Sequence, residues 1–131
     1  MEMMTRVVLV AGLPGSGKTH YALECLKDKE GLLIDDIKDI FILKDVLEHN
    51  RVVYITDPHF CLGGVREKAE RLINSLAKVQ VEWVFFENNP DKCKRNVEYR
   101  DDGRKVDATL RHLSKHYKPP ENALTIWQPG Q

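Results

Sequence analysis

The sequence carries no net charge, because its 20 lysine and arginine residues are balanced by 20 aspartate and glutamate residues in a chain of 131. No overall electric field therefore attracts the protein to DNA, RNA or an anionic membrane. This balance counts against a protein that tracks along nucleic acid, although it leaves room for a local basic pocket around one end.

Long apolar runs are also missing: the longest have the length of a strand, which is too short for a membrane span or a secretory signal. Cysteine is scarce, and Cys25, Cys61 and Cys93 form no C-x-x-C pair. This scatter predicts reduced thiols rather than a zinc site or a disulfide framework. We therefore expect a soluble cytoplasmic protein without membrane contact, built as a single domain over residues 1–131.

What the chain does contain is a glycine-rich turn between an apolar run and a helical pattern. Val7–Ala11 predicts a buried strand, and the residues after it read G-x-x-x-x-G-K-T, the signature of a phosphate-binding loop. Glycines let successive N–H groups point at an anion, and the following helix adds its positive end. The predicted nucleotide-binding residues of this loop are Gly12, Leu13, Pro14, Gly15, Ser16, Gly17, Lys18 and Thr19.

Two side chains of the loop have expected chemical roles. Lys18 is predicted to reach the β- and γ-phosphates as a catalytic residue, and the Thr19 hydroxyl is predicted to ligate Mg²⁺. ATP and Mg²⁺ are therefore the expected cofactors. Pro58 follows Asp57 where ATP-driven motors commonly have glutamate, and no N-K-x-D element is present. These two absences argue against a motor and against a GTPase switch.

The rest of the chain alternates between strand and helix patterns. Apolar runs predict strands at 7–11, 31–36, 52–57, 81–86 and 124–127, and helical spacing of apolar residues is clearest over 65–76 and 106–117. This alternation predicts an α/β fold of three layers, with a parallel sheet of about five strands and helices on both faces. In such sheets, ligands bind beyond the carboxyl ends of the strands.

Acidic residues close two of the predicted strands at that edge. Asp35 is predicted to be catalytic, accepting the proton of a substrate hydroxyl, while Asp36 is expected to be structural. Both could instead cap the helix that begins at Ile37. Lys38 lies one helical turn from Asp35 and either binds an anionic substrate group or is a solvated lysine. Asp57 is predicted to contact the substrate or to hold Mg²⁺ through water, and the alternative is a turn-capping aspartate.

A charged segment at about 90–105 separates the fourth strand from the last helix. It is poor in apolar residues, so it is predicted to lie outside the core and to form a lid over the triphosphate. Its basic residues are Lys92, Lys94, Arg95, Arg100, Arg104 and Lys105. Arg95 and Arg100 are the predicted phosphate ligands, because a guanidinium grips phosphate oxygens at two points, and Arg100 is also predicted to be catalytic. Trp127 either stacks on adenine or belongs to the core.

Together these motifs resemble the kinase domain of phage polynucleotide kinase and its P-loop kinase relatives over nearly the whole chain. The resemblance implies a single P-loop kinase domain in which Asp35 is the general base for a nucleic acid 5′-hydroxyl. It also implies that Lys38 binds the adjacent 3′-phosphate and that Arg95 and Arg100 clamp ATP. The matching stretches are Gly12–Thr19, Asp35-Asp36-Ile37-Lys38 (where the family has D-D-x-R), Thr56-Asp57 and Lys94-Arg95-Asn96.

Three functions follow from these observations. The first is a kinase that transfers the γ-phosphate of ATP to the 5′-hydroxyl of a polynucleotide, with a single-stranded 5′ end as its partner. The second is the same chemistry on a small hydroxyl compound, a nucleoside or a modified base within DNA. The third is a nucleotide-binding module without catalysis, which the acid pair and the arginines of the charged segment argue against.

Overall fold

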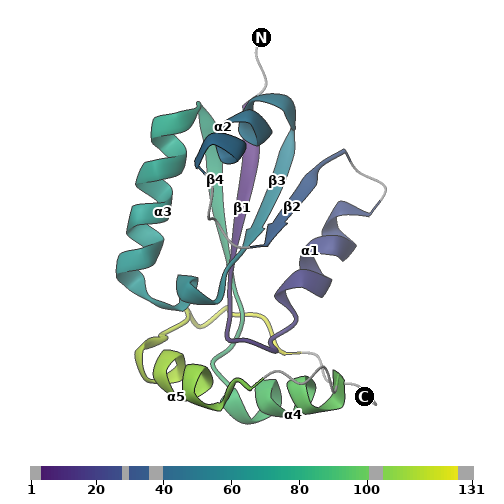
Figure 1. The fold of residues 1–131 in the computed structure, drawn as a ribbon, viewed down its shortest axis with the longest axis vertical. Coiled ribbons are helices and arrows are strands. Elements are labelled where there is room, and N and C mark those ends of the chain that lie inside the picture. Colours follow the sequence, from purple (N-terminus) through teal and green to yellow (C-terminus); the bar gives the residue numbers. More distant parts are fainter. Residues whose placement is uncertain (1–3, 28–29, 36–39, 101–104, 127–131) are drawn as a thin grey trace.

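A four-stranded parallel sheet forms the centre of the computed structural model, which describes residues 4–27, 30–35, 40–100 and 105–126 (Figure 1). The strand order is β2-β3-β1-β4, and all three strand pairings are parallel. The strands are β1 (Thr5–Ala11), β2 (Leu32–Asp35), β3 (Val52–Thr56) and β4 (Val79–Phe85).

Helices cover the sheet because each parallel connection has to cross over a face. They are α1 (Lys18–Leu26), α2 (Ile40–His49), α3 (Gly63–Leu76), α4 (Pro90–Arg100) and α5 (Asp107–His116), with a short 3₁₀ helix η1 (Pro58–Cys61) before α3. In Figure 1, α1 and α3 flank the sheet on opposite sides, while α4 and α5 lie across the carboxyl ends of the strands. None of the helices within these described ranges is long and apolar enough to cross a membrane.

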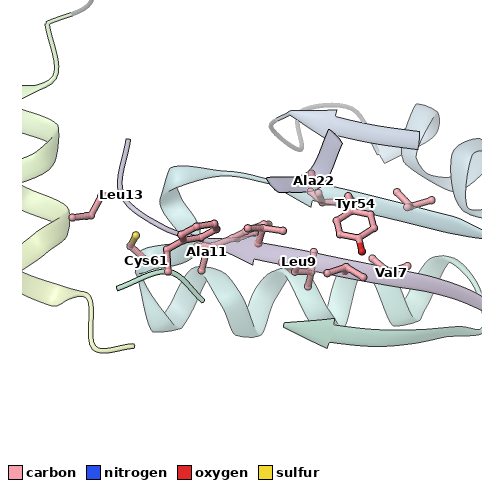
Figure 2. Packing of buried hydrophobic residues seen from close by; sticks show 14 of the residues in the cluster. Val7, Leu9, Ala11, Leu13, Ala22, Tyr54 and Cys61 are labelled. Atoms are coloured by element: carbon pink, nitrogen blue, oxygen red, sulfur yellow. The ribbon is translucent and has the colours of Figure 1, made fainter. Parts of the chain in front are cut away.

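The core is centred on β1, whose residues from Val7 to Ala11 are all buried. Figure 2 follows it along β1 from Val7 through Leu9, with Tyr54 beside the strand and Cys61 beyond its carboxyl end. A strand that is covered on both faces needs a continuous apolar run, which is what this segment supplies. The rigid strand then delivers the chain directly into the glycine-rich loop.

The predicted α/β fold is confirmed, with a smaller contribution from the last strand. Instead of a strand over 124–127, the described part of this segment forms one parallel bridge, between Phe86 and Leu124. The Leu124 backbone N–H donates to the Phe85 carbonyl at 2.8 Å, and its carbonyl accepts from Glu87 N–H at 2.8 Å. Trp127 lies outside the described residues.

The prediction that the charged segment stays out of the core was wrong for its first half. Cys93 and Val97 of α4 are 0% and 5% exposed. They are four residues apart and therefore share one face of the helix. Two small apolar residues are sufficient here because this face packs against a glycine of the loop, which has no side chain of its own.

Candidate active site

The glycine-rich loop depends on glycine at three positions. Gly15 and Gly17 have φ angles of 86° and 94°, a left-handed conformation that L-residues rarely adopt. Gly12 is needed for a different reason: a Cβ there would lie 2.4 Å from Ser16 Oγ. The loop ends at Gly17, which is the N-cap of α1. The first turn of α1 therefore presents its unpaired N–H groups beside the loop.

Lys18 is folded back onto the loop and is almost fully buried. Its ammonium group donates hydrogen bonds to the carbonyl of Gly12 at 2.9 Å and to that of Leu13 at 3.0 Å. Burial lowers the pKa of Lys18 to about 8, and the negative charges of Asp35 and Asp57 oppose this shift. The ammonium group is thus held against the loop backbone, and it would lose its proton at a pH near 8.

The two buried thiols near Lys18 are not nucleophiles. Burial raises the pKa of Cys61 and of Cys93 to about 12, although the charge of Lys18 acts in the opposite direction. A thiol needs to be ionised to react, so both stay protonated at neutral pH. Both side chains belong to the buried hydrophobic core.

Asp35 is placed beside the loop by the pairing of β2 with β3. Asp35 and Thr56 are register partners in neighbouring parallel strands, and the Thr56 hydroxyl donates a hydrogen bond to Asp35 Oδ1. The same carboxylate oxygen lies 3.5 Å from Thr19 Oγ1. A strand end and a buried threonine therefore hold one carboxylate next to the threonine that is predicted to bind Mg²⁺.

These groups line one cavity of about 1020 Å³. Its wall includes the loop from Pro14 to Thr19, together with Asp35, Thr56 and Arg100. Lys18, Thr19, Asp35 and Arg100, which the sequence predicts as functional residues, are thus brought together. Gly12 and Leu13 of the predicted loop are buried behind the wall and contact Lys18 with their carbonyls.

Three other predicted residues have different placements. Asp57 is not among the cavity-lining residues; its Oδ1 accepts from the His59 backbone N–H at 2.8 Å and lies 2.9 Å from His59 Nδ1. These contacts cap η1, as the turn-capping alternative describes, and its contact with Mg²⁺ or the substrate stays a prediction. Arg95 is exposed and does not line the cavity. Lys38 lies outside the described residues.

Two of the basic residues in the charged segment form ion pairs with neighbouring acids. Lys92 Nζ lies 3.2 Å from Glu87 Oε1, and Lys94 Nζ lies 3.5 Å from Asp107 Oδ1. They tie the start of α4 to its surroundings rather than facing the cavity. Arg100 is therefore the basic residue of the described segment that lines the cavity wall.

Sequence reasoning missed two polar residues that shape the site. Asn96 Nδ2 donates to the carbonyl of Gly15 at 3.0 Å. The Tyr117 hydroxyl donates to the carbonyl of Phe86, just after β4, and lies 3.4 Å from the Ala11 carbonyl at the end of β1. Asn96 was part of the K-R-N stretch, and its spacing of four from Arg100 was the available signal. Tyr117 carries no such signal, because its partners are distant in the chain.

Oxygen ligands suited to Mg²⁺ meet at Thr19 and Asp35. Within the described ranges, no group of three or more histidine, cysteine, aspartate or glutamate side chains is arranged to hold a metal ion. Mg²⁺ does not require such a group, because it is commonly held by one or two protein oxygens plus waters and substrate phosphates. The Thr19 hydroxyl fits that mode of binding as a single protein ligand, with the Asp35 carboxylate 3.5 Å from it.

Comparisons with known proteins agree with this arrangement. No family model matches the chain. It is 33% identical over 108 residues to an uncharacterized protein of Acanthamoeba polyphaga mimivirus, covering 79% of this chain and 78% of that protein. The crystal structure of APE1195 superposes with a TM-score of 0.59 at 18% identity, covering 99% of this chain and 89% of that one.

A second solved structure, a gluconokinase from Sinorhizobium meliloti 1021, superposes with a TM-score of 0.62 at 12% identity. The superposition covers 98% of this chain and 86% of the gluconokinase. At these levels of sequence identity, both superpositions describe a shared fold.

Proposed function

The chain belongs to the same family as the mimivirus protein, and from its P-loop kinase-like fold we propose that it is an ATP-dependent phosphotransferase with a hydroxyl acceptor. One observation carries the proposal: a single cavity is lined by the phosphate loop, by Lys18 and Thr19, and by the carboxylate of Asp35. A phosphate-binding loop alone would suit any nucleotide-binding protein. The carboxylate beside it supplies the group that a transfer to an alcohol requires.

The loop is the binding site for the triphosphate of ATP. Its glycines and the N-terminus of α1 supply N–H groups, and Lys18 supplies a cation. Ser16 is consistent with this assignment: the residue lines the cavity, and its buried Oγ has no hydrogen-bond partner within the described part of the chain. Mg²⁺ held by the Thr19 hydroxyl would neutralise part of the charge on the phosphates.

The transfer step needs little from the protein beyond position and one base. The acceptor oxygen forms a bond to the γ-phosphorus while the bond from phosphorus to the β–γ bridging oxygen breaks, and ADP leaves. Asp35 takes the proton of the acceptor hydroxyl. Arg100 and Lys18 face the charge that develops on the transferred group.

The acceptor that we propose first is the 5′-hydroxyl of a polynucleotide. Its support is the Asp35-Asp36-Ile37-Lys38 stretch, in which a basic residue follows the proposed base by three positions in the sequence. That residue would bind the 3′-phosphate next to the reacting nucleoside. A single phosphate contact of this kind requires no overall positive charge on the protein.

A small hydroxyl compound is the second candidate, and the composition of the cavity favours it. The lysine and arginine side chains among the described residues of its wall are Lys18 and Arg100, and both are assigned to the triphosphate. Glu24 and the aromatic rings of Tyr21 and Tyr99 also line the cavity. Such a wall suits a neutral acceptor better than a phosphorylated one.

Incubation with γ-labelled ATP and Mg²⁺ distinguishes these acceptors. The panel contains a 5′-hydroxyl oligonucleotide, the same oligonucleotide with a 5′-phosphate as its matched control, and the free nucleoside. Label on the 5′-hydroxyl oligonucleotide alone supports the first candidate, and label on the nucleoside alone replaces it with the second. Binding of ATP without transfer to any acceptor favours the non-catalytic nucleotide-binding module.

A further inference from the structure

Helix α4 contacts the phosphate loop at Gly15 more closely than any side chain would allow. A Cβ on Gly15 would lie 2.4 Å from the carbonyl oxygen of Cys93 and 2.9 Å from Cγ2 of Val97. Both α4 residues are buried. The first turns of α4 are therefore docked on the loop, so this part of the charged segment is a fixed wall of the site.

Asn96 adds a directed bond to this contact. Its side-chain amide donates to the Gly15 carbonyl at 3.0 Å. In a planar trans peptide the carbonyl and the following N–H point in opposite directions. Holding the Gly15 carbonyl toward α4 therefore turns the Ser16 N–H the other way, where it donates to the Leu13 carbonyl at 3.0 Å. The Gly15–Ser16 peptide plane is thus held by Asn96 on one side and by the Leu13 carbonyl on the other.

We infer that Asn96 is a positioning residue for ATP, which acts by holding the Gly15–Ser16 peptide so that the loop keeps the shape that receives the triphosphate. This inference rests on the proposed function of the same site. Because the Leu13 carbonyl also accepts from Lys18 Nζ at 3.0 Å, the same peptide network reaches the ammonium group to which the proposed function assigns phosphate binding. Asn96 thereby acts on the nucleotide through the backbone.

The residue type fits the role. An asparagine amide donates to a carbonyl, whereas aspartate, its isostere, would present only acceptor oxygens there. Arg100 lies four residues further along and on the same side of α4, where it lines the cavity. The contact that orients the loop thus also determines where this arginine enters the site.

The test compares ATP binding by the wild type, Asn96→Leu, Asn96→Ala and Glu98→Gln. Asn96→Leu keeps nearly the same shape without a donor, and Glu98→Gln is the matched control on the same helix, at an exposed residue that does not line the cavity. Calorimetry measures the dissociation constant of ATP. Steady-state kcat and KM for ATP are measured with the hydroxyl compound that the wild type phosphorylates, and denaturant unfolding is measured for each variant.

Loss of the hydrogen bond to the Gly15 carbonyl predicts that both Asn96 variants bind ATP about three- to tenfold more weakly, with KM for ATP raised in parallel. Glu98→Gln should match the wild type. A purely structural role would lower the folded fraction and the apparent kcat but leave KM for ATP unchanged. That result, wild-type ATP affinity in both Asn96 variants, or failure of both to fold would overturn the inference.

ATP binding by the wild-type protein distinguishes failure of the proposed function from failure of the positioning role of Asn96. If it does not bind ATP, the proposed function fails before Asn96 is considered. If it binds ATP and the Asn96 variants bind equally well, only the positioning role fails.

Discussion

The buried surroundings of Lys18 predict that ATP binding depends on pH. Burial lowers its pKa to about 8 in the ligand-free protein, and the proposed role in binding phosphate requires the charged form. Raising the pH above 8 removes that charge, so ATP affinity should fall, by up to about tenfold per pH unit. The measurement is the dissociation constant of ATP between pH 7 and 10.

Lys18→Arg is the control for this pH profile. A guanidinium stays charged throughout that range, so the affinity of the variant, whatever its value at pH 7, should show no decline that begins near pH 8. An identical decline in both proteins would assign the pH dependence to a different group.

Alanine substitutions at Gly15 and Gly17 distinguish the cost of a left-handed backbone from the cost of a steric clash. Gly15 and Gly17 both have positive φ angles, but only Gly15 has neighbours within reach of a Cβ. Gly17→Ala should lose about 1–2 kcal/mol of unfolding free energy from the left-handed backbone alone. Gly15→Ala should lose more, about 2–5 kcal/mol, because its methyl group also meets α4. Chemical denaturation measures both, and equal losses would contradict the docking of α4 on the loop.

Among the helices and strands, the prediction from sequence failed where a buried face depends on a contact with a segment that is distant in the chain. The strands could be predicted because buried parallel strands need continuous apolar runs, and Val7–Ala11 is such a run. The buried face of α4 could not, because Cys93 and Val97 are two apolar residues among many charges, and their partner Gly15 is far away in the chain. A short apolar stripe becomes informative only when its neighbour is known.

In the candidate site, too, residues in local motifs could be predicted and residues that act through distant contacts could not. Lys18 and Thr19 were predicted from a local motif, and Asp35 from its place at a strand end, since parallel strands share one carboxyl edge. The contacts of Asp57 with His59 are local and agree with the capping alternative. Asn96 and Tyr117 act on carbonyls of other elements, and no local spacing reports such partners.

Tyr117, the residue after α5, connects that helix to the ends of β1 and β4. Its hydroxyl is buried and donates to the carbonyl of Phe86, with the Ala11 carbonyl 3.4 Å away. Tyr117→Phe leaves the Phe86 carbonyl without that donor and should lower the free energy of unfolding by about 1–3 kcal/mol. Denaturant unfolding is the measurement. Tyr99→Phe, at an exposed ring, is the control and should change the free energy of unfolding by less than about 0.5 kcal/mol. Equal losses in the two variants would show that the Tyr117 hydroxyl bond does not stabilise the fold.

For the molecule as a whole, the strand order determines where the site lies. The chain crosses from β1 to β2 on one side of the sheet and from β3 to β4 on the other, so β1 and β3 lie side by side where the direction reverses. Ligands of open α/β sheets bind at such a switch point. The phosphate loop follows β1, and Thr56 ends β3 while holding Asp35 from β2.

The central claim is that this edge of the sheet holds a phosphate donor and a base for an alcohol in one cavity. Transfer of label from γ-labelled ATP to a hydroxyl acceptor, by the wild type and by Asp35→Asn, tests it most directly. We expect labelled acceptor with the wild type. With Asp35→Asn we expect the rate to fall by at least about a hundredfold, while ATP affinity stays within a few-fold of wild type. A fully active Asp35→Asn variant would contradict it.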